Sequence, residues 1–239
     1  MAMALAQEQE RPLDALAYLE CLLALAGFAV LSFVDPPYGR HSSPSSGPRV
    51  PARTAWAVQE LPSLAVPLYE CARASPERLR SAPNRVLLAM FLAHYTQRSL
   101  IFPFLIRGGK PTPLYSCVIA FFFCAYNGYL QSRYLSQYAV YADDWVTDPR
   151  FLIGECPQLQ TPPHSNHRGL FEYVTAANYF GEIVEWGGYA LASWSLQGGA
   201  FALFTFCVLL PIAKKHHQWY LEKFEDYPKF RKILIPFLF

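Results

Sequence analysis

The stretch Leu170–Trp194, LFEYVTAANYFGEIVEWGGYALASW, has the length and apolar content of a membrane-spanning helix. It nevertheless contains the polar residues Glu172, Asn178, Glu182 and Glu185. The last three follow an i, i+4, i+7 spacing, so on a helix the amide and the two carboxylates share one face. An acid at bilayer depth costs about 2.5–3.5 kcal/mol on insertion scales, so we expect this face to point inward. The stretch predicts an internal polar chamber in a helical membrane protein; the alternative is a helix at the interface with its acids in water.

The composition favours a membrane protein as well. Hydrophobic residues make up 53% of the 239 residues, aromatic residues 16% and charged residues only 16%, whereas about a quarter of the residues of soluble domains are charged. The net charge of +2 gives no sign of a nucleic-acid partner. We therefore expect an all-α, polytopic helical membrane protein with membrane lipid around it.

The cysteines show no metal-binding or disulfide pattern. There is no CxxC pair and no accompanying histidine spacing, so we predict small buried apolar side chains and no metal site. The six residues are Cys21, Cys71, Cys117, Cys124, Cys156 and Cys207.

The hydrophobic runs predict six spans, each close to the length that a bilayer requires. The second should be kinked near Glu60, because Pro62 and Pro67 follow it. The run Phe151–Gly154 is too short to cross, although it could belong to a re-entrant segment. The predicted spans are Leu13–Val34, Thr54–Tyr69, Val86–Ile106, Leu114–Leu130, Leu170–Trp194 and Leu196–Ala213.

Two of these spans bury groups that could act on a carbonyl substrate. A neutral carboxylic acid and a tyrosine hydroxyl can together polarise a ketone oxygen. Glu60 and Tyr95 are candidates for this role toward an apolar ketone arriving from the bilayer. The alternatives are that Glu60 is a structural partner of Arg98 and that Tyr95 packs a helix interface.

Long blocks of the sequence resemble the steroid 5α-reductase family, in particular its type 1 branch. The blocks include VPARTAWAVQELPSLAVPLY, RVLLAMFLAHYTQRSLIFPFLIRGGKP, RGLFEYVTAANYFGEIVEW and HHQWYLEKFEDYPKFRKILIPFLF. The resemblance implies one integral-membrane domain over residues 1–239, with its reductase part from about residue 86. It also implies a seven-helix, multi-pass enzyme of the endoplasmic reticulum that uses NADPH to reduce the 4,5 double bond of 3-oxo-Δ4 steroids such as testosterone and progesterone.

The resemblance also implies roles for individual residues. The glutamate of QELPS and the tyrosine of the HY pair bind the C3 ketone in the family, and here they are Glu60 and Tyr95. From its residues alone, the tail histidine beside Lys214 and Lys215 would be a solvated juxtamembrane side chain. The cofactor positions implied by the resemblance are Asn178, Glu182, His216 and Tyr220, with Trp56 and Arg98 as weaker candidates.

The chain departs from the family at two places. The family's fifth helix and its NIHSD, LRKPG and GYxIP elements, which hold the nucleotide's phosphates and ribose, are replaced by ECPQLQTPPHSNH. Ile212 stands where the family places an arginine near the cofactor. We therefore expect six spans instead of seven and weak NADPH binding. The alternatives are an inactive or regulatory isoform, and a reductase of polyprenols or long-chain enoyl thioesters.

Overall fold

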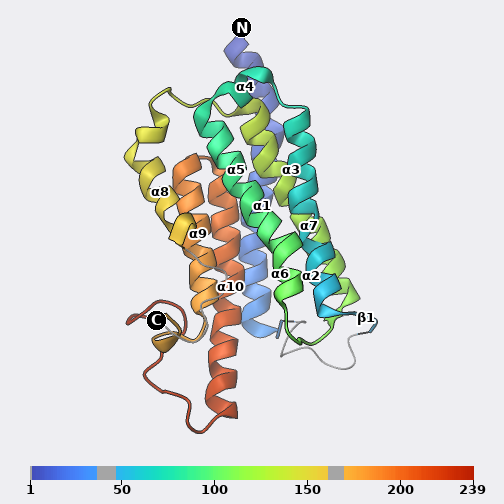
Figure 1. Ribbon diagram of the computed structural model, residues 1–239, viewed down its shortest axis with the longest axis vertical. Coiled ribbons are helices and arrows are strands. Elements are labelled where there is room, and N and C mark those ends of the chain that lie inside the picture. The colour runs from blue at the N-terminus through green and yellow to red at the C-terminus, as the bar shows by residue number, and fades with distance from the viewer. Residues whose placement is uncertain (1, 37–46, 161–169) are drawn as a thin grey trace. The chain divides into compact units, whose positions relative to one another are not determined.

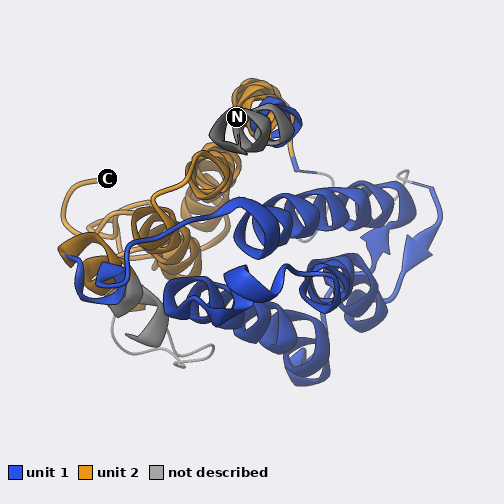
Figure 2. Ribbon diagram, turned by 90° about the horizontal axis from the view of Figure 1, so that it is seen from above, with its two compact units in different colours: residues 1–16, 36–148 blue, residues 17–35, 149–239 orange. Residues whose placement is uncertain are grey.

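A computed structural model describes the backbone of residues 2–36, 47–160 and 170–239, without the side chains of residues 2–10 and 155–160. The described part is mostly helical, which confirms the all-α prediction. Its one sheet is a short antiparallel ladder of β1 (Arg49–Val50) and β2 (Thr112–Pro113). The chain forms two compact units, residues 1–16 with 36–148 and residues 17–35 with 149–239 (Figure 2). The single-domain assignment stays a prediction.

Helix α1 (Ala2–Phe33) contributes to both units, because the boundary falls between Leu16 and Ala17. Within unit 1, α3 and α7 lie side by side, α2 contacts α7, and α5 contacts α3 (Figure 1). The other helical elements of unit 1 are α2 (Ala52–Glu60), α3 (Pro62–Ala72), α4 (Pro76–Arg80), α5 (Ala82–Thr96), η2 (Gln97–Ile101), α6 (Phe102–Leu105), α7 (Leu114–Arg133), η3 (Tyr134–Tyr138) and η4 (Trp145–Thr147).

The second predicted span is interrupted where the kink was predicted. Helix α2 ends at Glu60 and α3 begins at Pro62, with Leu61 between them. Proline is tolerated in the first turn of a helix, where its missing N–H would have no intrahelical partner. The break places Glu60, which is buried, at the C-terminal end of α2.

The predicted span Val86–Ile106 contains a π-helical turn, η2. At its end the Phe102 N–H donates to the carbonyl of Gln97, five residues earlier. Pro103, the next residue, has no N–H to continue an ordinary helical ladder. Such turns inside helices are frequent at functional sites, and this one contains Arg98.

Unit 2 packs α9 (Ala177–Ser193) between α8 (Pro149–Gln160) and α10 (Leu196–Lys223), with a short 3-10 turn η5 (Leu170–Glu172) before α9 (Figure 1). The α8–α9 contact depends on Gly154. A Cβ there would lie 2.3 Å from the carbonyl oxygen of Gly188 and 2.9 Å from the Cβ of Ala192. The two backbones therefore meet at small residues on both helices.

The structure corrects the predicted helix Leu170–Trp194, because α9 begins only at Ala177. The preceding residues pair with the C-terminal segment instead. Thr175 N donates to the Lys232 carbonyl at 2.9 Å, and Ala176 N donates to the Ile233 carbonyl at 3.1 Å. Glu172 consequently lies outside the helix.

The apolar run Phe151–Gly154 does not stop the helix as the sequence suggested. Helix α8 extends for 12 residues, and at 1.5 Å per residue it is about 18 Å long. The hydrocarbon core of a bilayer is about 30 Å thick, so α8 is too short to cross it. Residues 161–167 of the replacement stretch and the side chain of Cys156 lie outside the described residues.

Two described helices are long and apolar enough to span a membrane, within Arg11–Phe33 and Leu196–Lys223. The other four predicted spans do not pass this test, and the number of six spans stays a prediction. Cys117, Cys124 and Cys207 are buried as expected, whereas Cys21 and Cys71 are half-buried, and all five are free thiols.

Candidate active site

An ion pair in unit 1 connects two of the predicted site residues. Arg98 Nη2 donates to Glu60 Oε1 at 3.0 Å, and the two side chains are 21% and 10% exposed. The pair joins the end of α2 to the π-helical turn η2, which are far apart in sequence. The sequence left open that Glu60 is a structural partner of Arg98, and the fold contains this ion pair.

Aromatic rings cover the guanidinium of Arg98. Its Cζ lies 4.8 Å from the ring centre of Trp56 and 5.9 Å from that of Phe102, and the two rings meet edge to face at 5.1 Å. A cation over an aromatic face is attracted by the ring quadrupole. Trp56 therefore fixes the orientation of Arg98, and Arg98 in turn holds Glu60.

Tyr95 is buried beside this pair. It is 5% exposed, and its side chain lies within electrostatic range of both Glu60 and Arg98 and within hydrogen-bonding range of Ser63. Ser63 Oγ donates to the carbonyl of Cys124 at 3.1 Å. The two residues predicted to bind a ketone thus lie in one cluster of unit 1.

Sequence reasoning missed Ser63 and Phe102 as members of this cluster. Both follow a recognised residue by one helical turn: Ser63 comes three residues after Glu60, and Phe102 four residues after Arg98. Residues three and four apart are neighbours on a helix surface, so this spacing could have identified them.

The remaining predicted site residues belong to unit 2. His216 and Tyr179 have ring centres 5.5 Å apart, and Tyr220 stacks on Tyr227 at 5.1 Å with an interplanar angle of 15°. His216 and Tyr220 lie in the polar, C-terminal part of α10. The structure therefore groups His216 and Tyr220 with other aromatic side chains of the tail.

The described residues do not enclose the polar face predicted for Asn178, Glu182 and Glu185. Asn178 is exposed and the two glutamates are half-buried. The reason is the late start of α9, which places Asn178 in the first turn and not in the middle of a span. Ile212, which replaces the family's arginine, is 1% exposed.

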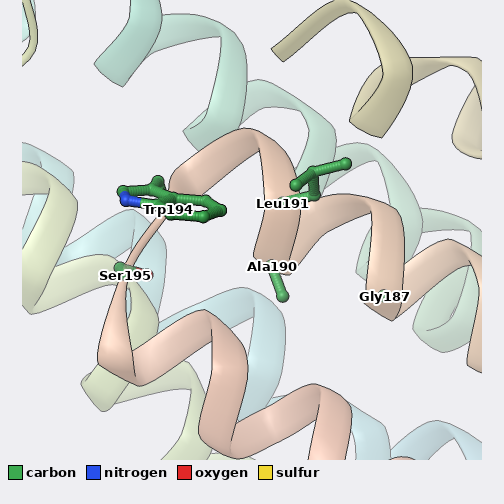
Figure 3. A pocket seen from close by; sticks show the side chains of 5 residues that line it. All are labelled: Gly187, Ala190, Leu191, Trp194 and Ser195. Carbon is green, nitrogen blue, oxygen red and sulfur yellow. The ribbon is translucent and has the colours of Figure 1, made fainter. Parts of the chain in front are cut away.

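A surface hollow in unit 2 does not involve any predicted site residue. It has a volume of about 410 Å³ and lies where α9 turns into α10 (Figure 3). Among the described residues, no group of three or more His, Cys, Asp or Glu side chains could hold a metal ion. The hollow is lined by Gly187, Ala190, Leu191, Trp194 and Ser195.

Comparison with known proteins connects this arrangement to an enzyme family. A family described as 3-oxo-5-alpha-steroid 4-dehydrogenase matches residues 110–159 and 163–239. The 3-oxo-5-alpha-steroid 4-dehydrogenase 1 of Bos taurus is 62% identical over 248 residues, covering 95% of this chain and 96% of the relative. The Homo sapiens protein of the same name is 61% identical over 259 residues, covering all of both chains.

A second group of relatives is less similar. The 3-oxo-5-alpha-steroid 4-dehydrogenase 2 of Homo sapiens is 43% identical over 240 residues, covering 91% of this chain and 94% of the relative. The predicted resemblance, with the type 1 branch ahead, is therefore confirmed.

The alignments also show a length difference. The human type 1 relative aligns over 259 positions with a chain of 239 residues, so at least 20 positions (259 − 239) hold no residue of this chain. The family match is interrupted at residues 160–162. This interruption falls in the stretch where we expected the family's fifth helix to be missing.

Proposed function

Because the chain belongs to the 3-oxo-5-alpha-steroid 4-dehydrogenase family, we propose that it reduces the 4,5 double bond of 3-oxo-Δ4 steroids such as testosterone and progesterone, using NADPH. The names of the relatives at 61–62% identity support 5α-reduction of a steroid. They also favour a steroid over a polyprenol or an enoyl thioester. The two helices able to span a membrane support a membrane location, which we propose to be the endoplasmic reticulum, with several passes.

The observation that carries this proposal is the cluster of Glu60, Tyr95 and Arg98 in unit 1. A steroid ketone is apolar except for its C3 oxygen, so its binding site needs few polar groups at one point. Buried Tyr95 supplies a hydroxyl donor. Arg98 and Trp56 hold Glu60 in a fixed position nearby.

The proposed roles of Glu60 and Tyr95 follow from the hydrogen bonds that each side chain can make. Arg98 occupies Oε1 of Glu60, so in the neutral acid Oε2 is the oxygen whose O–H would donate a hydrogen bond to the ketone. Tyr95 would donate a second hydrogen bond to the same C3 oxygen. Both bonds strengthen as negative charge develops on that oxygen during reduction, which lowers the barrier. The α-carbon of the resulting enolate would then take a proton from solvent.

NADPH, when bound, would supply a hydride to the β-carbon of the enone. The residues we propose to hold it are His216, Tyr220, Asn178 and Glu182, with Trp56 and Arg98 as weaker candidates. The ring contacts of His216 and Tyr220 fit an aromatic cofactor. Ile212 does not fit a phosphate, because a buried isoleucine offers no hydrogen-bond donor.

A second candidate function is favoured by the positions that this chain lacks. A chain without its phosphate-binding segment could act as an inactive or regulatory isoform that associates with a full-length reductase. Co-purification of the two chains would support this candidate.

The test is 5α-reduction of labelled testosterone in microsomes from cells that express the chain, with NADPH titrated. We expect NADPH-dependent product and a KM for NADPH far above that of the human type 1 relative. Tyr95→Phe should reduce turnover about 100-fold, because it removes one donor to the developing oxyanion. Tyr126→Phe is the matched control, since that hydroxyl donates to the backbone carbonyl of Leu16.

The outcomes separate two claims. Absence of product from a folded chain at every NADPH concentration, or equal turnover by Tyr95→Phe, would refute the proposed function. An NADPH KM equal to that of the human relative would refute only the interpretation of the missing segment.

A further inference from the structure

A cationic pocket lies against the C-terminal segment of unit 2, apart from the residues proposed for catalysis. Its volume is about 310 Å³. Three of its side chains carry a formal positive charge, and of the described residues that line it none is acidic. The lining residues are His217, Lys229, Arg231, Lys232, Ile233, Leu238 and Phe239.

The pocket is held in shape by a chain of polar contacts. The Thr175 hydroxyl lies 2.5 Å from Nδ1 of His217 and 2.8 Å from the hydroxyl of Tyr227. The guanidinium of Arg231 lies 5.3 Å from the ring centre of Tyr227. Backbone bonds between Tyr173 and Lys232 fasten the tail beside these residues. The cations are therefore positioned by the fold and not only by the sequence of the tail.

Arg231 lines this pocket and has an unmet hydrogen-bond donor. Its Nε is buried and has no partner among the described residues. A buried N–H without an acceptor is costly, and a guanidinium matches the oxygens of a phosphate. The arginine thus points to an anionic ligand with several oxygen acceptors.

The position of the pocket relative to α10 indicates where that ligand comes from. Leu234 of the tail packs against Ala213 and Ala176. Ala213 is the last apolar residue of α10 before Lys214 and Lys215, so the tail lies where this helix would leave the hydrocarbon. At this level a membrane presents the phosphate groups of its lipids.

Exposed apolar side chains adjoin the cations. Phe230 is 70% exposed, Phe237 is 75% exposed and Leu238 is 78% exposed. Large exposed apolar groups beside Lys and Arg are typical of surfaces that enter the membrane interface. A soluble phosphate would use the cations and leave these groups in water, whereas a phospholipid would cover both.

We propose that this pocket binds the headgroup of an anionic phospholipid. Its phosphate accepts hydrogen bonds from Arg231 and is neutralised by Lys232 and Lys229, while its acyl chains lie along Phe237 and Leu238. The proposal concerns lipid binding and not steroid reduction, so its test uses a binding measurement.

The experiment is titration of the purified full-length chain in detergent with short-chain phosphatidylserine and, separately, short-chain phosphatidylcholine, read by native mass spectrometry. We expect phosphatidylserine to bind about tenfold more tightly. Arg231→Gln should weaken phosphatidylserine binding about tenfold, and Lys232→Gln about fivefold. Lys223→Gln, which removes a charge at the exposed end of α10 outside the pocket, should leave binding unchanged.

Several results would overturn the proposal. These are equal binding of the two lipids, unchanged binding by folded Arg231→Gln, and displacement of the lipid by NADPH, which would assign the pocket to the cofactor. Inorganic phosphate that binds as tightly as the lipid would also refute it. If Arg231→Gln does not fold, Lys232→Gln decides, because that side chain is exposed and Lys232 bonds to Tyr173 and Thr175 through its backbone, which the substitution leaves in place.

Discussion

Unit 1 contains two glutamate–arginine ion pairs that look alike by length and burial. Arg98 meets Glu60 at 3.0 Å, and Arg133 meets Glu70 at 3.1 Å. The glutamate side chains are 10% and 7% exposed, and the arginine side chains 21% and 30%. Neither the distance nor the burial distinguishes a candidate active site from a structural contact.

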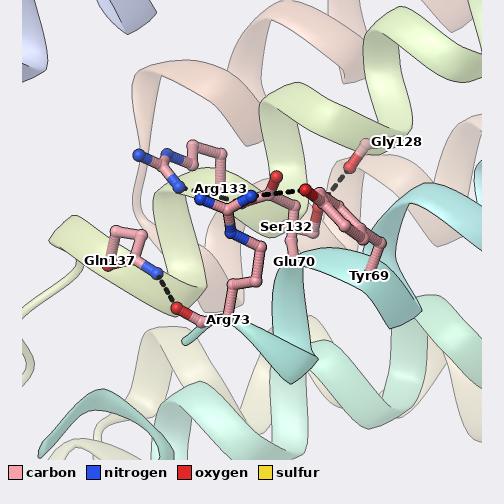
Figure 4. A network of polar contacts seen from close by, with 7 residues as sticks. All are labelled: Tyr69, Glu70, Arg73, Gly128, Ser132, Arg133 and Gln137. Atoms are coloured by element: carbon pink, nitrogen blue, oxygen red, sulfur yellow. Dashed lines mark hydrogen bonds and ion pairs between the residues drawn. The ribbon is translucent and has the colours of Figure 1, made fainter. Parts of the chain in front are cut away.

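The neighbours of the two pairs differ. Around Arg133 the polar side chains bond backbone carbonyls: Ser132 Oγ donates to Gly128 at 2.6 Å, and Gln137 Nε2 donates to Arg73 at 2.8 Å (Figure 4). The ion pair ties α3 to the end of α7, and the Gln137 contact ties η3 to the end of α3. Around Glu60 and Arg98 lie aromatic rings and the buried Tyr95. The second pair therefore links α3 to α7, whereas the first pair lies beside the buried Tyr95, which we propose as a donor to the substrate.

The largest expected effect concerns Glu60→Gln. Glutamine keeps the shape but removes the carboxyl group that pairs with Arg98 and faces the ketone, so we expect turnover of testosterone to fall about 100-fold. The measurement is turnover per amount of folded protein in microsomes. Glu70→Gln is the matched control and should keep its turnover. Equal losses in the two variants would break the distinction drawn between the pairs.

The next effect is on stability. Glu70→Gln leaves Arg133 without its carboxylate, which should lower the free energy of unfolding by about 1–3 kcal/mol, below the full cost of breaking a buried pair because Arg133 is partly exposed. Thermal unfolding in detergent, followed by circular dichroism, measures it. The double variant Glu70→Gln/Arg133→Gln should recover part of the loss. If the double variant recovers no stability, the unpaired charge of Arg133 is not the cause of the loss in Glu70→Gln.

The smallest effect concerns the aromatic faces beside the two arginines. Trp56→Leu removes the ring at 4.8 Å from Arg98 and should raise the KM for steroid about threefold to tenfold. Tyr138→Leu removes the ring at 5.9 Å from Arg133 and should cost only about 0.5 kcal/mol of stability. Steady-state kinetics and thermal unfolding of both variants test this. A KM change in Tyr138→Leu would contradict the assignment.

The helical class and the break at Glu60 could be predicted because they depend on local chemistry. Apolar runs of this length favour helices in a membrane protein. Pro62 has no N–H to continue the backbone hydrogen bonds of α2. Helix α8 was underestimated for a reason outside its own residues. Its Gly154 packs against Gly188 and Ala192 of α9, and this contact supports a helix that its sequence only weakly favours.

By itself, the sequence determined the class of protein, the family and the candidates Glu60 and Tyr95, because composition and motif spacing are local properties. Only the tertiary structure decided that Glu60 pairs with Arg98, 38 residues away, and that α9 starts at Ala177. In both cases the partner comes from a distant part of the chain. Such contacts form when folding brings backbone and side-chain donors to acceptors that no local pattern encodes.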